Sequence, residues 1–135
     1  MQEENKMGCR GTIEIWNNAA APTSAERPVV LYTHWGAKRM LFDLITTLGK
    51  EQRWNDAAYL SRMIFCQMVR NNLHSTTGFG ILTDNVGDAE EEIVVDIDRQ
   101  EVIRKRIGHD NQRFTFSELI EDESNNPDDG SWEGR

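Results

Sequence analysis

Residues that build catalytic and metal-binding motifs are scarce in this chain, whose 135 residues include two cysteines and three histidines. Two cysteines, Cys9 and Cys66, are too few for a disulfide framework. No C-x-x-C or H-E-x-x-H spacing occurs, and we therefore expect neither a metal site nor a cofactor. A Cys-His catalytic pair is also disfavoured, because no cysteine and histidine lie at close spacing.

Long apolar runs are missing as well. No run approaches the roughly 18 apolar residues that a membrane-spanning helix requires. The first residues, MQEENKMGCRG, contain neither the basic region nor the apolar region of a secretory signal. We therefore expect a cytoplasmic protein with no membrane partner.

Negative charge is plentiful but unevenly placed. The net charge is -8, and residues 121–135 hold six acids and one arginine, whereas residues 1–7 hold two acids and one lysine. This composition predicts a flexible leader over 1–7 and an acidic, disordered tail over 121–135, on either side of a single domain over 8–120. An acidic chain also disfavours general nucleic-acid binding.

The hydrophobic pattern predicts an α+β fold. Short alternating or β-branched runs predict strands at 11–16, 29–35, 78–82, 91–98 and 101–107, with a further short strand at 114–116. Two helices lie between these groups of strands, and a brief helix follows Ser117. We expect an antiparallel sheet of about five strands, in the order β-β-α-α-β-β-β, packed on a two-helix hairpin.

The second helix, over 54–72, is the most apolar stretch and is expected to be mostly buried. Its apolar positions at helical spacing are Ala57, Leu60, Met63, Ile64 and Met68, widened by Tyr59, Phe65, Cys66 and Val69. Asn55 is the expected N-cap, with Trp54 packed on Tyr59 across it. The first helix, between Gly36 and Gly49, has a narrower stripe, and the residues expected outside it are Lys38, Arg39, Asp43 and Thr47.

The segment Thr33-His34-Trp35-Gly36 is the first candidate site. A strand end beside a helix start is a place where backbone N–H groups bind anions, and histidine titrates near neutral pH. Arg10 is a candidate companion if the first two strands pair. The alternative is structural: Trp35 packs under the sheet edge and His34 bonds to a carbonyl, since a lone histidine makes no catalytic pair.

An acidic stretch is the second candidate. Residues 84–98 hold seven acids and no base, whereas residues 99–113 hold five bases and two acids. Two aspartates on one strand face, Asp96 and Asp98, have the spacing to share a hard cation such as Mg²⁺ or Ca²⁺. The favoured interpretation is cross-strand ion pairing on a solvated face.

A glycine-rich segment, T-T-G-F-G at 76–80, is only loosely similar to a phosphate-binding loop. It lacks the Lys-Ser/Thr pair and follows a helix instead of preceding one. We expect its glycines to let the sheet backbone lie close to the second helix.

Four segments of the chain resemble sequences found in other proteins. They are G-x-R-G-T-I-E at 8–14, V-V-L-Y-T-H-W-G at 29–36, W-N-D-A-x-Y-L-x-R-x-I-F at 54–65 and T-T-G-F-G-I at 76–81. Together they resemble small proteins from phage and prokaryotic genomes, in which a G-x-R strand is followed by an L-Y-x-x-W-x-G strand. The resemblance implies no catalytic residues. It implies a phage or mobile-element setting in the host cytoplasm, where small acidic proteins often bind and block host factors.

The leading hypothesis is thus a small acidic cytoplasmic binding protein without catalysis, which binds and inhibits a host defence protein with a basic surface. An alternative is a small-molecule or nucleotide binder, or a weak hydrolase, with its site around His34. A third hypothesis is a homodimer formed through the sheet face or the helical hairpin. The candidate binding residues are Arg10, His34, Trp35, Asp84, Asp88, Glu90, Glu91, Asp96 and Asp98.

Overall fold

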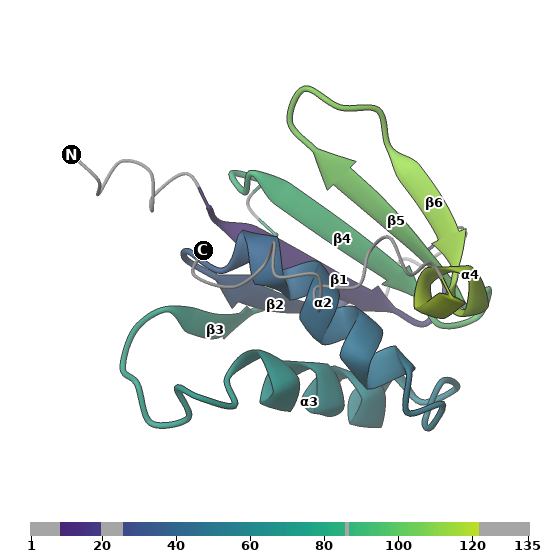
Figure 1. The fold of residues 1–135 in the computed structure, drawn as a ribbon, viewed down its shortest axis with the longest axis horizontal. Helices are drawn as coiled ribbons and strands as arrows, with labels where there is room; N and C mark the ends of the chain where they lie inside the picture. The colour runs from purple at the N-terminus through teal and green to yellow at the C-terminus, as the bar shows by residue number, and fades with distance from the viewer. Residues whose placement is uncertain (1–8, 20–25, 86, 122–135) are drawn as a thin grey trace.

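The computed structural model describes residues 9–19, 26–85 and 87–121 (Figure 1). The predicted leader, and the predicted tail apart from its first residue, lie outside these described residues. Within them the chain forms an α+β fold, as the sequence predicts. The elements are β1 (Gly11–Trp16), β2 (Val29–Thr33), α2 (Ala37–Leu48), α3 (Ala57–Met68), β3 (Phe79–Leu82), β4 (Glu91–Asp96), β5 (Glu101–Arg106), β6 (Gln112–Thr115) and α4 (Phe116–Glu121). None of the described helices is long and apolar enough to cross a membrane.

The sheet has six strands in the order β3-β2-β1-β4-β5-β6. β1 pairs antiparallel with β2, as expected, but it pairs parallel with β4. The prediction of an antiparallel sheet of about five strands is therefore wrong in strand number and in the direction of this pair. Pairing β1 with β4 places an apolar surface at the centre of the sheet. It consists of four side chains that are at most 2% exposed: Ile13, Ile15, Ile93 and Val95.

Because β4 lies beyond β2 and β1 in the sheet, the connection between β3 and β4 must cross these strands. It crosses them on the face opposite the helices. Asn85 fixes this crossing. Its side-chain N–H₂ donates to the Thr12 hydroxyl at 3.3 Å and to the Glu14 carboxylate, while the Gly87 N–H donates to the Asn85 side-chain oxygen at 2.9 Å. Thr12 and Glu14 alternate with the core-facing Ile13, so the loop covers the second face of β1.

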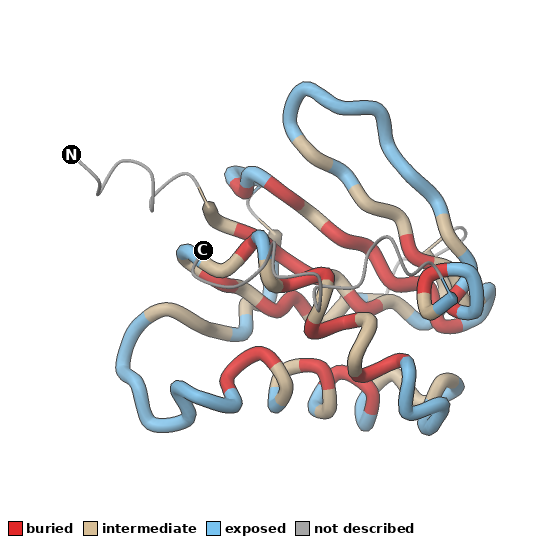
Figure 2. The backbone as a smooth tube through the Cα atoms, in the orientation of Figure 1, coloured by how far each residue is buried: buried red, intermediate tan, exposed pale blue. Residues whose placement is uncertain are grey.

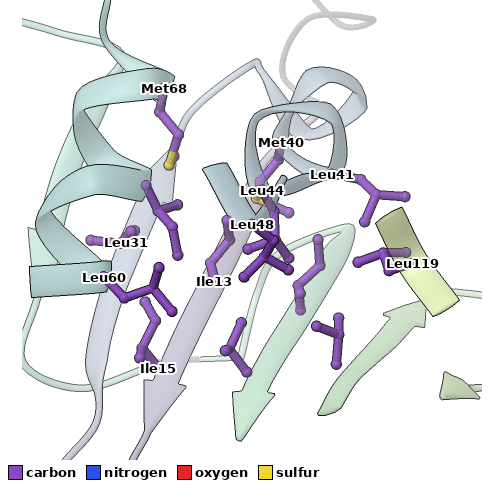
Figure 3. Close-up of a cluster of buried hydrophobic side chains, with 14 of the residues drawn as sticks. Ile13, Ile15, Leu31, Met40, Leu41, Leu44, Leu48, Leu60, Met68 and Leu119 are labelled. Carbon is purple, nitrogen blue, oxygen red and sulfur yellow. The ribbon is translucent and has the colours of Figure 1, made fainter. Parts of the chain in front are cut away.

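Helix α2 lies at the centre of the core (Figures 1 and 3). Seven of its twelve residues are buried, and it packs against α3, α4 and β1. Figure 3 shows Met40, Leu44 and Leu48 directed toward Ile13 of β1, with Leu41 on the side of α4. The N-terminal Gly11 of β1 permits this approach, because a Cβ there would lie 2.8 Å from the Met40 side chain.

Helix α3 is less buried than the sequence predicts. It spans Ala57–Met68, not 54–72, and four of its twelve residues are buried: Leu60, Ser61, Ile64 and Met68. The expectation that Tyr59 and Cys66 lie in the core is wrong, because both are exposed. Figure 2 shows buried and exposed stretches alternating along α3, as expected of a helix with one covered face. The helix covers the β2 side of the sheet, so its outer apolar residues have no element to pack on among the described residues.

The start of α3 also differs from the prediction. Asp56, not Asn55, is the N-cap, and its carboxylate accepts the Tyr59 N–H at 3.1 Å. Trp54 does not pack on Tyr59. It lies edge-on to Phe116 of α4, with ring centroids 5.3 Å apart, and Tyr59 lies under the Arg53 guanidinium instead.

The two faces of α3 give a test of this packing. Ile64→Asp places a carboxylate at a position with 0% exposure, and we expect the variant to lose its cooperative melt, because the cost of several kcal/mol approaches the whole stability of a domain. Cys66→Asp, on the exposed face, should change the free energy of unfolding by about 0.5 kcal/mol or less. Thermal melts by circular dichroism measure both, and equal destabilisation would contradict the assignment of faces.

Candidate binding surface at edge strand β3

Two segments that are far apart in the sequence meet at one end of the sheet. β2 pairs antiparallel with β3, and the His34 N–H extends the ladder by donating to the Gly78 carbonyl at 2.8 Å. The segment around His34 and Trp35 therefore lies beside the glycine-rich segment 76–80. No local sequence pattern links these two segments, so their contact could not be predicted from the sequence.

Gly78 makes this contact possible. Its φ is +99°, a conformation that L-residues rarely adopt, and a Cβ would lie 3.0 Å from the Trp35 ring. The glycines were expected to bring the backbone close to α3, and in the structure Gly78 accommodates Trp35 instead. Gly80 differs, because no described atom lies within 4 Å of the position that its Cβ would take.

His34 is held by aromatic neighbours. Its Nδ1 shares a hydrogen bond of 2.8 Å with the Tyr32 hydroxyl, and the Trp35 ring meets it edge-on with centroids 5.1 Å apart. Nε2 has no hydrogen-bond partner among the described residues. The three side chains line an open cleft of about 340 Å³ together with Thr77, Gly78 and Phe79. An imidazole oriented by a phenol, not by a carboxylate, offers binding contacts more readily than base catalysis.

The helix start beside His34 has its first N–H groups already occupied. The Gly36 N–H donates to the Thr33 hydroxyl at 2.9 Å, and the Ala37 N–H donates to the Cys9 carbonyl at 2.9 Å. A Cβ at Gly36 would lie 2.7 Å from the Thr33 hydroxyl oxygen, so glycine is required for this turn. These bonds leave less capacity for an anion than the sequence pattern predicts.

The outer edge of β3 is open in the described part of the chain. In an antiparallel ladder the residues alternate between hydrogen-bonding toward the neighbour and away from it. Because His34 bonds to Gly78, the alternate residues Phe79 and Ile81 direct their N–H and C=O groups away from β2. Ile81 is also 61% exposed. The edge therefore presents both backbone hydrogen-bonding groups and an apolar side chain to solvent.

A partly buried ion pair that no sequence pattern predicts lies next to this edge. Asp43 was expected outside the apolar stripe of α2, but it is 4% exposed and accepts a 2.8 Å bond from Arg70. Arg39 and Phe79 also line the cavity of about 100 Å³ beside it. Burial raises the pKa of Asp43 from 3.8 to about 6, although Arg70 and, more weakly, Arg39 act to lower it. No sequence signal links residues 43 and 70.

The other predicted residues lie at both ends of β1 and β4. Arg10, Asp88, Glu90 and Glu91 lie near the starts of these parallel strands, at the sheet end where β2 leads into His34, whereas Asp96 and Asp98 lie near the far end of β4. The guanidinium of Arg10 pairs with Asp88 at 3.2 Å, and no hydrogen bond joins Arg10 to His34 among the described residues. Asp84 and Glu90 are exposed. The structure thus brings Arg10 together with one predicted acid and not with the predicted histidine.

Three acids of the predicted patch differ in burial. Glu91 is buried and accepts a 2.7 Å bond from Arg104 of β5, so the expected cross-strand ion pair exists but lies on the helix-covered face, not on a solvated one. Asp96 is 3% exposed and accepts the Arg99 N–H at 3.2 Å. Asp98 lies in the turn after β4 and is exposed.

Within the described residues, no group of three or more His, Cys, Asp or Glu side chains is placed to hold a metal ion. No family model, curated protein or solved structure matches the chain. The functional argument therefore depends on the geometry of the chain itself.

The raised pKa of Asp43 predicts a specific pH dependence. The folded protein binds the proton more tightly than the unfolded chain does, so this group favours folding below pH 3.8, and the contribution is lost as the pH rises through about 6. The loss amounts to about 3 kcal/mol. Asp43→Asn should therefore gain stability relative to wild type as the pH rises, measured by urea unfolding across this range. Asp98→Asn, at an exposed turn, is the control and should run parallel to wild type, and a parallel curve for Asp43→Asn would contradict the assignment.

The two glycines of β3 and its preceding turn provide a second test. Gly78→Ala combines an unfavourable φ with a close contact to Trp35, and should destabilise the protein by about 1–3 kcal/mol. Gly80→Ala has open space and no positive φ, and should be neutral within about 0.5 kcal/mol. Denaturant titrations measure the free energy of unfolding of both variants. Similar destabilisation by the two substitutions would mean that Trp35 is not packed on Gly78.

Proposed function

We propose that this chain is a small acidic binding protein without catalysis, on which a protein partner docks by adding a strand to β3. One observation carries the proposal: Phe79 and Ile81 direct backbone groups outward from the sheet edge, and these groups have no partner among the described residues. Natural sheets usually guard such edges with lysine, proline or a bulge, and the β3 sequence F-G-I-L contains neither lysine nor proline. Added strands use such edges for main-chain hydrogen bonding.

The opposite edge of the sheet is built differently. β6 carries Arg113, which pairs with Glu101 of the neighbouring strand at 2.9 Å. A charged side chain on an edge disfavours pairing with another strand, because the charge would lose water. The contrast between the two edges supports β3 as the docking edge.

Apolar side chains near β3 supply contact area in addition to the backbone. β3 has four residues, so an added strand gains only a few hydrogen bonds from it. Trp35 is 47% exposed and Ile81 is 61% exposed, and both lie on the β3 side of the sheet. Exposed aromatic and aliphatic residues beside a free edge are typical of interaction surfaces.

The contacts of the two candidate titratable groups favour binding over catalysis. His34 bonds to Tyr32 at 2.8 Å, and Asp43 bonds to Arg70 in a separate cavity. His34 faces the cleft but is oriented by a phenol and not by a carboxylate, and Asp43 is buried and paired, so neither group has the environment typical of a general base.

The biological setting comes from the resemblance alone. Under the proposal the chain is a phage or mobile-element protein that acts in the host cytoplasm and inhibits a host defence protein. The exposed acids Asp84, Asp88 and Glu90 are candidates for contact with a basic region of that partner.

A second candidate function is binding of a small molecule or nucleotide in the cleft of Tyr32, His34 and Trp35. The observation in its favour is the cleft volume of about 340 Å³, near the lower limit of about 300 Å³ for ligand pockets. A rise in melting temperature of several degrees with one nucleotide would favour this function over strand addition.

A homodimer is the form of strand addition in which the partner is a second copy of the chain. The melting temperature of such a dimer would depend on protein concentration.

A pair of variants at one residue tests strand addition. Ile81→Pro removes an outward N–H without removing a bond to β2, whereas Ile81→Val keeps that N–H and is the control. Peptides selected on the wild-type protein from a random display library should bind Ile81→Pro about tenfold more weakly and Ile81→Val nearly normally. Titration calorimetry measures the affinities, and melts verify that both variants fold. Equal binding by all three proteins would overturn the proposal.

A further inference from the structure

We infer that the segment docking at β3 is acidic and places an aromatic side chain over Gly80, against Tyr32. The inference rests on the proposed function and specifies the chemistry of the partner. It depends on two independent observations: an unfilled position on the sheet surface, and a local excess of positive charge in an acidic chain.

The unfilled position is Gly80. It lies opposite Tyr32 in the β2–β3 register, so both residues belong to the sheet face away from α2 and α3. No described atom lies within 4 Å of the place that a Cβ on Gly80 would occupy. Tyr32 therefore has a free side toward the edge, over the backbone of β3.

Strand spacing decides which side chain uses this space. A residue of an added strand opposite Gly80 points to the same face and lies two interstrand spacings of about 4.8 Å from Tyr32. Alanine, serine and valine are too short to cross that distance. Phenylalanine, tyrosine and tryptophan reach across a glycine and gain an aromatic contact with Tyr32.

The Tyr32 ring is already held in place. Its hydroxyl is bonded to Nδ1 of His34 at 2.8 Å, and the His34 ring is in turn met edge-on by Trp35. Because the three rings are fixed before a partner arrives, less conformational entropy is lost on docking. The face beside Gly80 is thus a preorganised aromatic platform.

The charge around β3 has the opposite sign to that of the whole chain. Residues 27–42 and 57–83, which include β2, α3 and β3, hold five bases, and the acids that border them in the sequence are Asp43, Asp56 and Asp84, although the chain carries a net charge of -8. Arg39 and Arg70 line the cavity that Phe79 shares. The acid of that cavity, Asp43, is buried and paired with Arg70. An acidic segment complements this region, whereas a basic one is repelled.

A second copy of the chain is a poorer occupant. Pairing β3 with β3 would bring the Arg39 and Arg70 regions of two copies together. Like charges at such a contact oppose association. The observations therefore favour a different protein with an extended acidic segment.

The experiment compares peptide selections on three proteins: wild type, Gly80→Val and Ile81→Pro. The probe is a display library of random peptides. Wild type should enrich peptides in which Asp or Glu residues flank an aromatic residue, and Gly80→Val should lose the aromatic preference. Gly80→Val is expected to fold, because valine favours strands and the site is open, and Gly80→Ala serves as a smaller substitution with an intermediate effect.

A double-mutant cycle quantifies the contact. One enriched peptide and its aromatic→Ala version are titrated against wild type and Gly80→Val. The aromatic peptide should lose about threefold to tenfold in affinity with Gly80→Val, whereas the alanine peptide should bind both proteins equally. Affinity of the acidic peptide should also fall as salt is added.

The outcomes separate the two proposals. If wild type enriches no peptides beyond those enriched by Ile81→Pro, strand addition itself is overturned. If peptides require the Ile81 N–H but lack acids, or bind Gly80→Val as tightly as wild type, strand addition stands and the present inference is overturned. Enrichment of the β3 sequence itself would point to a second copy and would also overturn it.

Discussion

The parallel pairing of β1 with β4 is the constraint on which the other features of this fold depend. It joins two strands whose inward residues are buried. It also means that β1 has β2 on one side and β4, which follows much later in the sequence, on the other. Parallel neighbours cannot be joined by a tight turn, so the chain must return across the sheet before β4 begins. Residues 83–85 and 87–90 belong to that return on the face opposite the helices, and β3 is consequently left at the edge, beyond β2.

The local elements of the fold could be predicted from the sequence, but their partners could not. β1 and β4 have clear alternation, and α2 ends at the glycine that the pattern indicates. Which strands pair depends on contacts between segments about 80 residues apart, for which one sequence carries no signal. The burial of the helices was misjudged for a related reason. α3 is the more apolar helix, yet α2 lies among more elements, and the number of neighbours determines what is covered.

The candidate site shows the same division. The location of His34 at a strand end followed from the sequence, whereas its bond to Tyr32 did not, although residues two apart on a strand share a face. Gly78 and Gly80 look alike in the sequence and differ in the structure, because one has a φ of +99° and supports Trp35 while the other leaves open space. Asp43 and Arg70 are 27 positions apart, and each alone is consistent with a solvated helix face.

Under the proposed strand addition, the placement of charge decides which groups of a partner each region of the molecule attracts. Charges separated by more than a Debye length of about 8 Å are largely screened, so an acidic segment responds mainly to the charges close to the place where it docks and less to the net charge of -8. Beside β3 it meets Arg39 and Arg70, which line the cavity that Phe79 shares. Attraction therefore acts only on segments that already lie at the edge in the correct position. The exposed acids Asp84, Asp88 and Glu90, on and after the connection that crosses the other face, favour basic groups there. A partner with an acidic strand beside a basic surface satisfies both regions in one orientation, and the reversed orientation brings like charges together. Charge placement, more than net charge, thus selects how a partner docks.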